Sequence, residues 1–441
     1  MTFEEASRPR PIVRILRPFQ LFLENDTSIG ILLLAATVLA LVFANSPLAP
    51  LYNSFWHMPV SLTVGPWSIT HELHFWVNDL LMAIFFFVVG LEIKREVLVG
   101  ELASPRQAAL PIVAALGGVI VPASIYAMLN MGGVGAAGWG VPMATDIAFA
   151  LGAMALLGSR VPVTLKVFLT ALAIVDDIAA VLVIAVFYTS QIHWAALGYA
   201  AMVMAALLAA NWLGVRHPLP FGLLGILLWF AVLNSGVHAT IAGVLLAMTI
   251  PSRTVINPDQ FLADARSCID LFEQSCHRGQ SLMADEAKQS AVHALENACE
   301  EVQPPLHRME HSLHPWVMFV IMPIFALANA GVVLDANSLR FSNPVVLGVV
   351  LGLMLGKPIG ITLASWLAVR SGLASLPAGV SWAQIHGAGW LGGIGFTMSL
   401  FVASLAFQDE GLLTLAKLGI LAGSTMAGVV GAALLVRAGR R

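Results

Sequence analysis

The sequence predicts an all-α polytopic membrane protein with about twelve transmembrane helices. Of its 441 residues, 58% are apolar and 11% are charged, and the mean hydropathy is +0.85. This composition is too apolar for a soluble globular protein. A spanning helix needs about 20 mostly apolar residues, and the breaks at charge clusters and at Pro, Gly and Asn turns delimit the candidates. These are residues 28–45, 77–93, 108–130, 138–157, 166–188, 194–213, 219–234, 236–250, 315–333, 344–369, 384–407 and 413–436.

The positions of Lys and Arg predict the orientation, because basic residues in short loops stay in the cytoplasm. They precede the first span and follow the even-numbered spans, whereas the opposite loops 46–76, 131–137 and 189–193 contain none. Both termini are therefore expected in the cytoplasm, residues 1–27 leading into an uncleaved signal anchor and residues 437–441 ending the chain. The basic residues are Arg8, Arg10, Arg14, Arg17, Lys94, Arg95, Arg106, Arg160, Lys166, Arg216, Arg253 and Arg370, with Arg340 as the exception.

One hydrophilic segment divides the spans into residues 28–250, with helices one to eight, and residues 315–436, with helices nine to twelve. This segment, 251–314, is expected in the cytoplasm, where 259–303 can form one or two short amphipathic helices. It is either a solvated linker or a regulatory module. It holds the three cysteines, which are expected to be reduced, and their spacing matches no standard zinc motif. No cofactor and no nucleic-acid partner are indicated.

Charged side chains lie near the middle of several predicted spans. Asp146 is the only charged residue between 106 and 160, Asp176 and Asp177 are alone between 166 and 216, and Lys357 is alone between 340 and 370. A charge at the centre of a membrane helix costs about 2.5 to 3.5 kcal/mol, and such residues usually mark ion pathways or proton relays. The four residues therefore indicate a functional site at mid-membrane depth.

Two of these spans are expected to be interrupted. Glycines and Pro142 precede Thr145 and Asp146 in span 138–157, and five glycines precede Thr397 in span 384–407. Unwound backbone at membrane depth is tolerated where it is buried in protein or lines a wet cavity. Broken segments in corresponding positions of two halves indicate the ion site of a transporter, although small residues also serve close helix packing.

The carboxylates predict an exchange chemistry. Adjacent helical residues point about 100° apart, so Lys357 can hold one of Asp176 and Asp177 ionised and leave the other to take up a proton. A carboxylate in this position binds either a proton or a hard cation such as Na⁺, for which Asp176, Asp177 and the Thr145 hydroxyl supply oxygen ligands. The alternative is that the Asp and Lys side chains only lock helices together.

Further polar residues lie at the cytoplasmic ends of two spans. Glu92, Lys94, Arg95 and Glu96 close the second span, and Glu310, His311 and His314 precede the ninth. Carboxylates beside histidines can sense pH, although residues at helix ends are more often plain interfacial charges. His238 lies inside the predicted eighth span.

These residues resemble those of the bacterial NhaA-type sodium/proton antiporters over nearly the whole chain, except the acidic loop at roughly 254–304. The resemblance implies inverted repeats in spans three to five and ten to twelve, with spans four and eleven unwound and crossing. The strings that carry it are WVNDLLMAIFFFVVGLEIKREV from Trp76, VPMATDIAFALG from Val141, LTALAIVDDIAAVLVIAVFYT from Leu169, SGVHATIAGVLL from Ser235, EHSLHPWV from Glu310, FALANAGV from Phe325, GKPIGI from Gly356 and GGIGFTMSLFVASLAF from Gly392.

The resemblance also implies roles for individual residues. Asp177 is the principal cation and proton carboxylate, Asp176 assists it and engages Lys357, and Asp146 and Lys357 offset the helix dipoles at the crossing. The residues that match the family's pH-sensing positions are Glu92, Arg95, Glu96, Glu310, His314 and His238. The implied activity is electrogenic export of Na⁺ or Li⁺ against protons, rising at alkaline pH, in a bacterial inner membrane and with a possible homodimer.

Three alternative functions stay open from the residues themselves. One is a receptor or scaffold, which predicts that neutralising the mid-membrane charges leaves function intact. An intramembrane aspartyl protease also needs two membrane carboxylates, but the contexts here are Thr-Asp and Val-Asp-Asp, and that reaction leaves Lys357 without a role. A proton-coupled carrier of a small organic solute needs a larger cavity with aromatic and hydrogen-bonding groups, and spans four, five and ten offer few of these.

Overall fold

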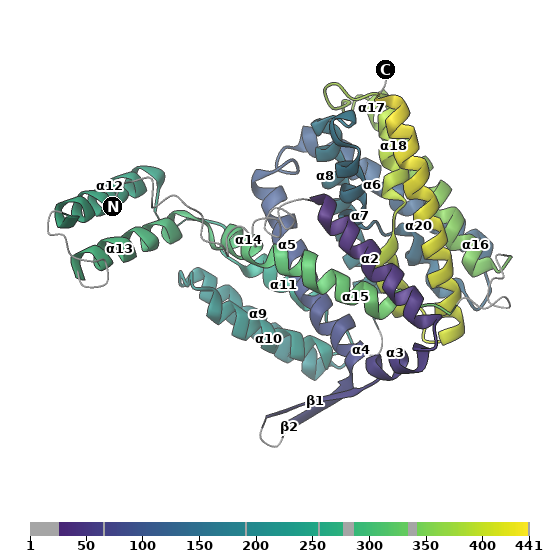
Figure 1. Ribbon diagram of the computed structural model, residues 1–441, viewed down its shortest axis with the longest axis horizontal. Helices are drawn as coiled ribbons and strands as arrows, with labels where there is room; N and C mark the ends of the chain where they lie inside the picture. Colours follow the sequence, from purple (N-terminus) through teal and green to yellow (C-terminus); the bar gives the residue numbers. More distant parts are fainter. Residues whose placement is uncertain are drawn as a thin grey trace.

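The structure is a computed structural model that describes residues 26–64, 67–189, 192–254, 256–276, 286–333 and 342–439. These residues form a bundle of helices and one small β-hairpin (Figure 1). The expectations for residues 1–25, for Arg340 and for residues 440–441 lie outside the described residues. The orientation of the chain in the membrane therefore stays a prediction.

The first part of the chain runs through the hairpin into the helices that carry the three aspartates. Short 3₁₀ or π segments, labelled η, interrupt several helices. The elements are α2 (Asp26–Ala44), α3 (Ala49–Trp56), β1 (Pro59–Val64), β2 (Trp67–Glu72), α4 (Leu73–Phe75), η2 (Trp76–Leu81), α5 (Met82–Val99), α6 (Pro105–Asn130), η3 (Ala136–Met143), α7 (Ile147–Leu156), η4 (Gly158–Arg160), α8 (Val163–Phe187), α9 (Trp194–Trp212), α10 (Pro218–Leu233) and α11 (Ile241–Thr249).

The second part begins with two helices that project from the side of the bundle (Figure 1) and then returns into it. The elements are α12 (Pro258–Cys276), α13 (Glu286–Val302), α14 (Pro305–Trp316), η6 (Val317–Ile321), α15 (Met322–Asn329), α16 (Pro344–Leu351), η7 (Gly352–Gly356), α17 (Lys357–Arg370), α18 (Trp382–Gly392), α19 (Phe396–Ala406) and α20 (Glu410–Ala438). Helices α12 and α13 fall where amphipathic helices were expected.

The described residues contain 9 helices long and apolar enough to cross a membrane, or up to 10 if the bent pair α18 and α19 forms one span. This confirms the predicted class, an all-α polytopic membrane protein. The predicted spans 219–234 and 236–250 correspond to α10 and α11, which have 16 and 9 residues. Because these two are shorter than a full crossing, the number of twelve spans and the inverted repeats stay predictions.

Two features of the fold differ from the sequence-based expectation. Residues 46–76, expected as a loop, contain α3 and an antiparallel hairpin in which Pro59 pairs with Glu72 and Val64 with Trp67. The helix expected to begin at residue 315 already begins at Pro305, because its first turns are polar and carry no hydropathy signal. Pro305 suits this start, since the first turn of a helix needs no amide donor from proline.

Aromatic packing fixes the position of α19 inside the bundle. The ring of Phe401 lies 5.5 Å from that of Phe86 on α5 and 6.2 Å from that of Phe325 on α15, measured between centroids. All three side chains are at most 1% exposed, and rings at these separations attract each other beyond simple burial. The half-helix that leads away from the second break is thereby held against two other helices.

Candidate functional site

The two helix breaks lie against each other. Between η3 and α7 the chain leaves helical geometry at residues 144–146, and between α18 and α19 it does so at 393–395, where the axis bends by 45°. The Asp146 amide donates to the Ile394 carbonyl at 2.7 Å, and the Thr145 hydroxyl donates to the Gly392 carbonyl at 2.8 Å. Each break thus supplies partners for the backbone that the other leaves unpaired.

Glycine makes this close approach possible. A Cβ atom on Gly393 would lie 2.4 Å from the Leu353 carbonyl oxygen, and one on Gly395 would lie 2.9 Å from the Ala144 carbonyl oxygen. Both distances are shorter than real side-chain contacts allow, so a larger residue at 395 would force the two breaks apart, and one at 393 would push its break away from η7. Steric crowding at the break therefore explains why glycines precede Phe396.

Asp146 lies at the N-terminal ends of two short helices. Its Oδ1 accepts the Phe149 amide of α7 at 3.0 Å, and its Oδ2 accepts the Thr397 amide of α19 at 3.0 Å and also the Thr397 hydroxyl. The residue is fully buried. Because the first amides of a helix carry partial positive charge, a carboxylate shared by two such ends is stabilised by both.

Lys357 joins the aspartate pair to the breaks. Its Nζ donates to Asp176 Oδ2 at 2.5 Å and to Thr145 Oγ1 at 2.8 Å, and Lys357 is completely buried. The Thr145 hydroxyl in turn donates to the carbonyl of Gly392, the last residue of α18. The cation therefore lies close to the C-terminal end of one half-helix, where partial negative charge accumulates.

The two neighbouring aspartates have different surroundings. Asp176 is paired with Lys357, although its Oδ1 has no hydrogen-bond partner. Asp177 is 3% exposed, and it makes no ion pair or hydrogen bond through its side chain among the described residues. An ionised carboxylate in this position is strongly disfavoured unless it binds something. Asp177 is thus suited to take up a proton or a cation.

A second polar cluster links α5 to α14. Arg95 Nη2 lies 3.1 Å from Glu96 Oε1, Arg95 Nε lies 3.1 Å from Glu310 Oε1, and Glu92 is 4.0 Å away. Glu92 and His314 line a small cavity of about 60 Å³ that reaches the first residues of α7. The structure therefore brings these predicted residues together beside the helix that Asp146 caps.

His238 lies apart from both clusters. Its Nε2 is 2.6 Å from the Tyr188 carbonyl oxygen, at the end of α8. The Tyr188 hydroxyl in turn donates to the Ala137 carbonyl at 2.8 Å and accepts the Gly140 amide at 3.3 Å. His238 therefore contacts the residue that holds η3 in place.

The sequence matches the model of the family described as Na+/H+ antiporter 1 over residues 20–435. The chain belongs to this family. It is 53% identical to the Na(+)/H(+) antiporter NhaA of Oleidesulfovibrio alaskensis, with 98% of this chain and 96% of that protein covered. The identity is 51% to the NhaA protein of Koribacter versatilis, over 98% and 94%, and 50% to NhaA 1 of Saccharophagus degradans, over 95% and 91%.

Membership of the Na+/H+ antiporter 1 family confirms the resemblance read from the sequence, and with the apolar helices it establishes a multi-pass membrane protein. The family is one of transporters. Neither the protease nor the carrier of organic solutes receives support from these matches.

One polar group was missed by the sequence reasoning. His74, Asn78 and Asp79 lie at the start of the second membrane helix, and Asn329 ends α15 beside them. A signal was available, because Asp79 is the only charged residue between Glu72 and Glu92. Asp79 lies near the end of an apolar stretch, and only charges near the middle of a predicted span count as candidates.

Proposed function

We propose that this protein exchanges Na⁺ for H⁺ across a bacterial inner membrane, exporting Na⁺ and Li⁺ against inward protons. The observation that carries this proposal is the asymmetry of the aspartate pair. Lys357 neutralises Asp176, while Asp177 is buried without a side-chain partner among the described residues. The names of the relatives, Na(+)/H(+) antiporters over nearly the full chain, agree with this chemistry.

In this mechanism one carboxylate alternates between two ligands. Deprotonated Asp177 binds Na⁺ together with oxygen atoms of Asp176 and of Thr145, and protonation expels the cation because the neutral acid no longer compensates its charge. Binding of the cation competes with Lys357 for Asp176, so the Lys357 ion pair is expected to loosen when Na⁺ enters. The two carboxylates titrate as a coupled pair.

Asp146 and Lys357 hold the two helix breaks in register while the site changes ligands. Their contacts are with the breaks themselves, at Thr397 and at Thr145, so their charges offset those of the half-helix ends. The protein needs no enzymatic chemistry and no cofactor for this exchange. Exchange of unequal numbers of protons and Na⁺ ions, and hence electrogenic transport, is part of the proposal.

We assign pH sensing to the residues that lie between the predicted cytoplasmic end of α5 and helix α7: Glu92, Arg95, Glu96, Glu310 and His314. Four of them form the ion-pair cluster around Arg95, and Glu92 and His314 line the cavity that ends at α7. A change in their ionisation therefore alters the surroundings of the helix that Asp146 caps. His238 acts separately, through Tyr188 and η3. Activity is expected to rise at alkaline pH.

The test uses everted membrane vesicles with an imposed pH gradient. Added Na⁺ or Li⁺ is expected to dissipate the gradient, whereas K⁺ is not. Asp177→Asn should abolish the response while the protein is still inserted at the wild-type level. Gly198→Ala is a matched control, because a Cβ at this position on α9 meets nothing within 4 Å. A Na⁺ response of Asp177→Asn equal to that of wild type would overturn the assignment.

A further inference from the structure

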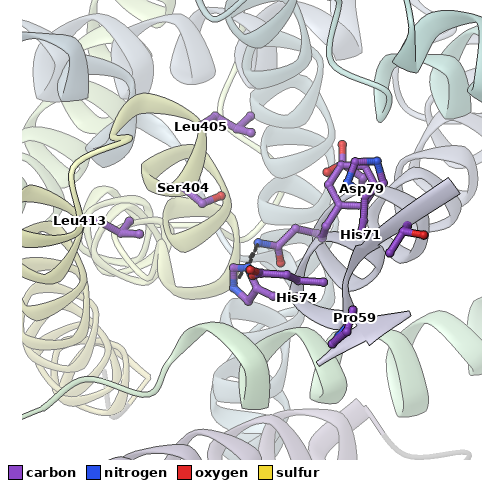
Figure 2. A pocket seen from close by; sticks show the side chains of 11 residues that line it. Pro59, His71, His74, Asp79, Ser404, Leu405 and Leu413 are labelled. Carbon is purple, nitrogen blue, oxygen red and sulfur yellow. Dashed lines mark hydrogen bonds between the residues drawn. The ribbon is translucent and has the colours of Figure 1, made fainter. Parts of the chain in front are cut away.

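A large pocket opens at the end of the molecule that carries the β-hairpin. Its volume is about 630 Å³, and its walls come from the hairpin, from the start of the second membrane helix, from the end of α19 and from the start of α20. Figure 2 shows His74 and Asp79 on one side of it and Ser404 and Leu413 on the other. The pocket is thus shared by segments that lie far apart in the sequence.

Asp79 is the residue in this pocket that needs a partner. Its carboxylate is half-buried and lines the pocket. Within the described residues it forms no ion pair and no hydrogen bond through its side chain. A carboxylate in an apolar helix is unfavourable unless it is paired or reaches water, so the pocket supplies either water or a cation.

The backbone around Asp79 is specialised. Residues Trp76–Leu81 form a π-helical turn, and a second such turn, Gly352–Gly356, directly precedes Lys357 at the mid-membrane site. Turns of this kind are rare and are frequent at functional sites. The extra residue in the turn rotates Asn78 and Asp79 out of the register that an uninterrupted α-helix would give them.

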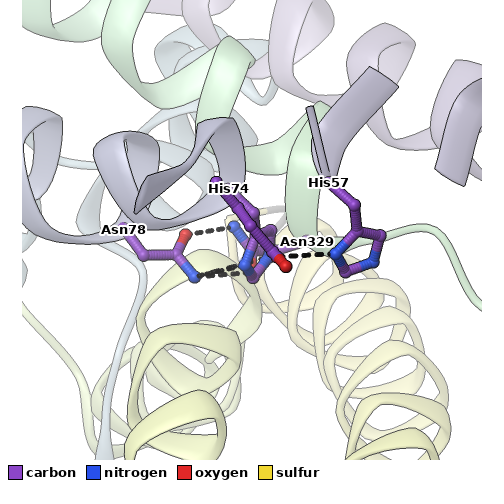
Figure 3. Close-up of polar contacts among 5 residues, drawn as sticks. His57, His74, Asn78 and Asn329 are labelled. Atoms are coloured by element: carbon purple, nitrogen blue, oxygen red, sulfur yellow. Dashed lines mark hydrogen bonds and ion pairs between the residues drawn. The ribbon is translucent and has the colours of Figure 1, made fainter. Parts of the chain in front are cut away.

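The wall beside Asp79 is held by a closed set of hydrogen bonds (Figure 3). The Asn329 amide nitrogen donates to Asn78 Oδ1 at 2.8 Å, and Asn78 donates back to Asn329 Oδ1 at 3.3 Å. His74 Nε2 lies 3.2 Å from the same Asn329 oxygen. Because these groups satisfy one another, they fix the wall and leave Asp79 as the group that is able to bind a ligand.

The pocket is connected mechanically to the mid-membrane site. Helix α19 begins at the break, where Thr397 binds Asp146, and its other end supplies Ser404 and Leu405 to the pocket. The eight residues from Thr397 to Ser404 are separated by seven helical steps, which span about 10 Å. The Arg95 cluster lies at the opposite end of α5, so the two polar groups flank the site from opposite sides.

We infer that this pocket binds a monovalent alkali cation on the hairpin side, with the Asp79 carboxylate as the principal ligand, before or after the cation occupies the mid-membrane site. The inference rests on the proposed function. The Asp79 carboxylate supplies the hard oxygen ligand that suits such an ion, and the pocket volume of about 630 Å³ leaves room for the water bound to the ion.

The first test compares Na⁺ supplied from the two sides, in vesicles of the two orientations. Asp79→Asn is expected to raise the half-saturating Na⁺ concentration on the hairpin side by about two- to fivefold, the range of an accessible charge contact. The half-saturating Na⁺ concentration on the opposite side should stay as in wild type, and Asp79→Glu should restore hairpin-side affinity. Equal Na⁺ dependence of Asp79→Asn and wild type on the hairpin side would overturn the inference.

The second test measures the pocket directly and does not depend on transport. The three native cysteines are replaced by serine, Ser404→Cys is introduced, and its modification by cationic and anionic methanethiosulfonates of similar size is timed from the hairpin side. The cationic reagent should react faster, Na⁺ should slow it relative to N-methylglucamine at equal ionic strength, and Asp79→Asn should remove both effects. Equal rates for the two reagents would contradict the inference. Absence of Na⁺ exchange by wild type in either orientation would instead refute the proposed function.

Discussion

The ammonium group of Lys357 lies 2.5 Å from Asp176 Oδ2, and the two side chains are 0% and 1% exposed. A buried ion pair of this kind adds little net stability compared with apolar residues, but loss of one partner leaves an uncompensated charge. Because Lys357 holds Asp176, the neighbouring Asp177 is the aspartate that remains available to bind a proton or a cation.

Lys357→Met is therefore expected to lower the free energy of unfolding by about 3 to 5 kcal/mol. Combination with Asp176→Asn should recover a large part of this loss, because the double variant no longer buries an unpaired carboxylate at position 176. Melting temperatures of the four proteins of this double-mutant cycle, in detergent at one pH, give the coupling. Additive losses would show that the two side chains do not interact.

Asp146 is expected to stabilise both half-helices through its two oxygens. Asp146→Ala removes the cap of α7 and the acceptor for Thr397, so we expect a loss of about 2 to 4 kcal/mol from one cap and one charged hydrogen bond. Thr397→Val keeps the amide contact and removes only the hydroxyl, so its loss should be smaller. Thermal unfolding of both variants checks the order, and a larger effect of Thr397→Val would contradict the double-cap geometry.

Gly393→Ala is expected to destabilise the protein by about 1 to 3 kcal/mol, the usual range for overpacking. The added Cβ would lie 2.4 Å from the backbone carbonyl of Leu353, and neither group can move aside easily. Gly198→Ala on α9 serves as the control, since it meets no atom within 4 Å. Comparable melting temperatures for the two variants would show that the break does not require glycine.

The helical pair α12 and α13 is expected to be dispensable for ion exchange. Its two ends are already joined at the bundle, where the Leu306 amide donates to the Pro251 carbonyl at 3.1 Å. Replacement of residues 257–301 by a short Gly/Ser linker should therefore preserve Na⁺-driven dissipation of the pH gradient. Loss of activity with normal insertion would favour the regulatory interpretation of this segment over that of a solvated linker.

Much of the site could be predicted because membrane segments contain so few charges. Asp146, Asp176, Asp177 and Lys357 stood out by their isolation in the sequence, and the structure places Lys357 against Asp176. Residue spacing alone could not decide the partner of Lys357, because Asp176 and Asp177 are neighbours on one helix; only the resemblance to NhaA-type antiporters implied Asp176. That choice depends on how α8 and α17 are rotated.

Other features left weaker signals in the sequence. Two short runs rich in β-branched residues flank Gly65 and Pro66 and indicate the hairpin. A search for apolar spans ignores such runs. The π-helical turn around Asp79 has no sequence pattern of its own. The early start of the helix at Pro305 was hidden because its polar first turns resemble a loop in hydropathy.

The most direct test of the central claim is proton release when Na⁺ is added to the purified protein. Wild type in weakly buffered detergent solution, at a pH within its active range, is expected to release protons on addition of NaCl and not on addition of KCl. Asp177→Asn should release none, and Asp79→Asn should still release them. Uptake of Na⁺ by wild type without any proton release would contradict competition between the two ions for one carboxylate.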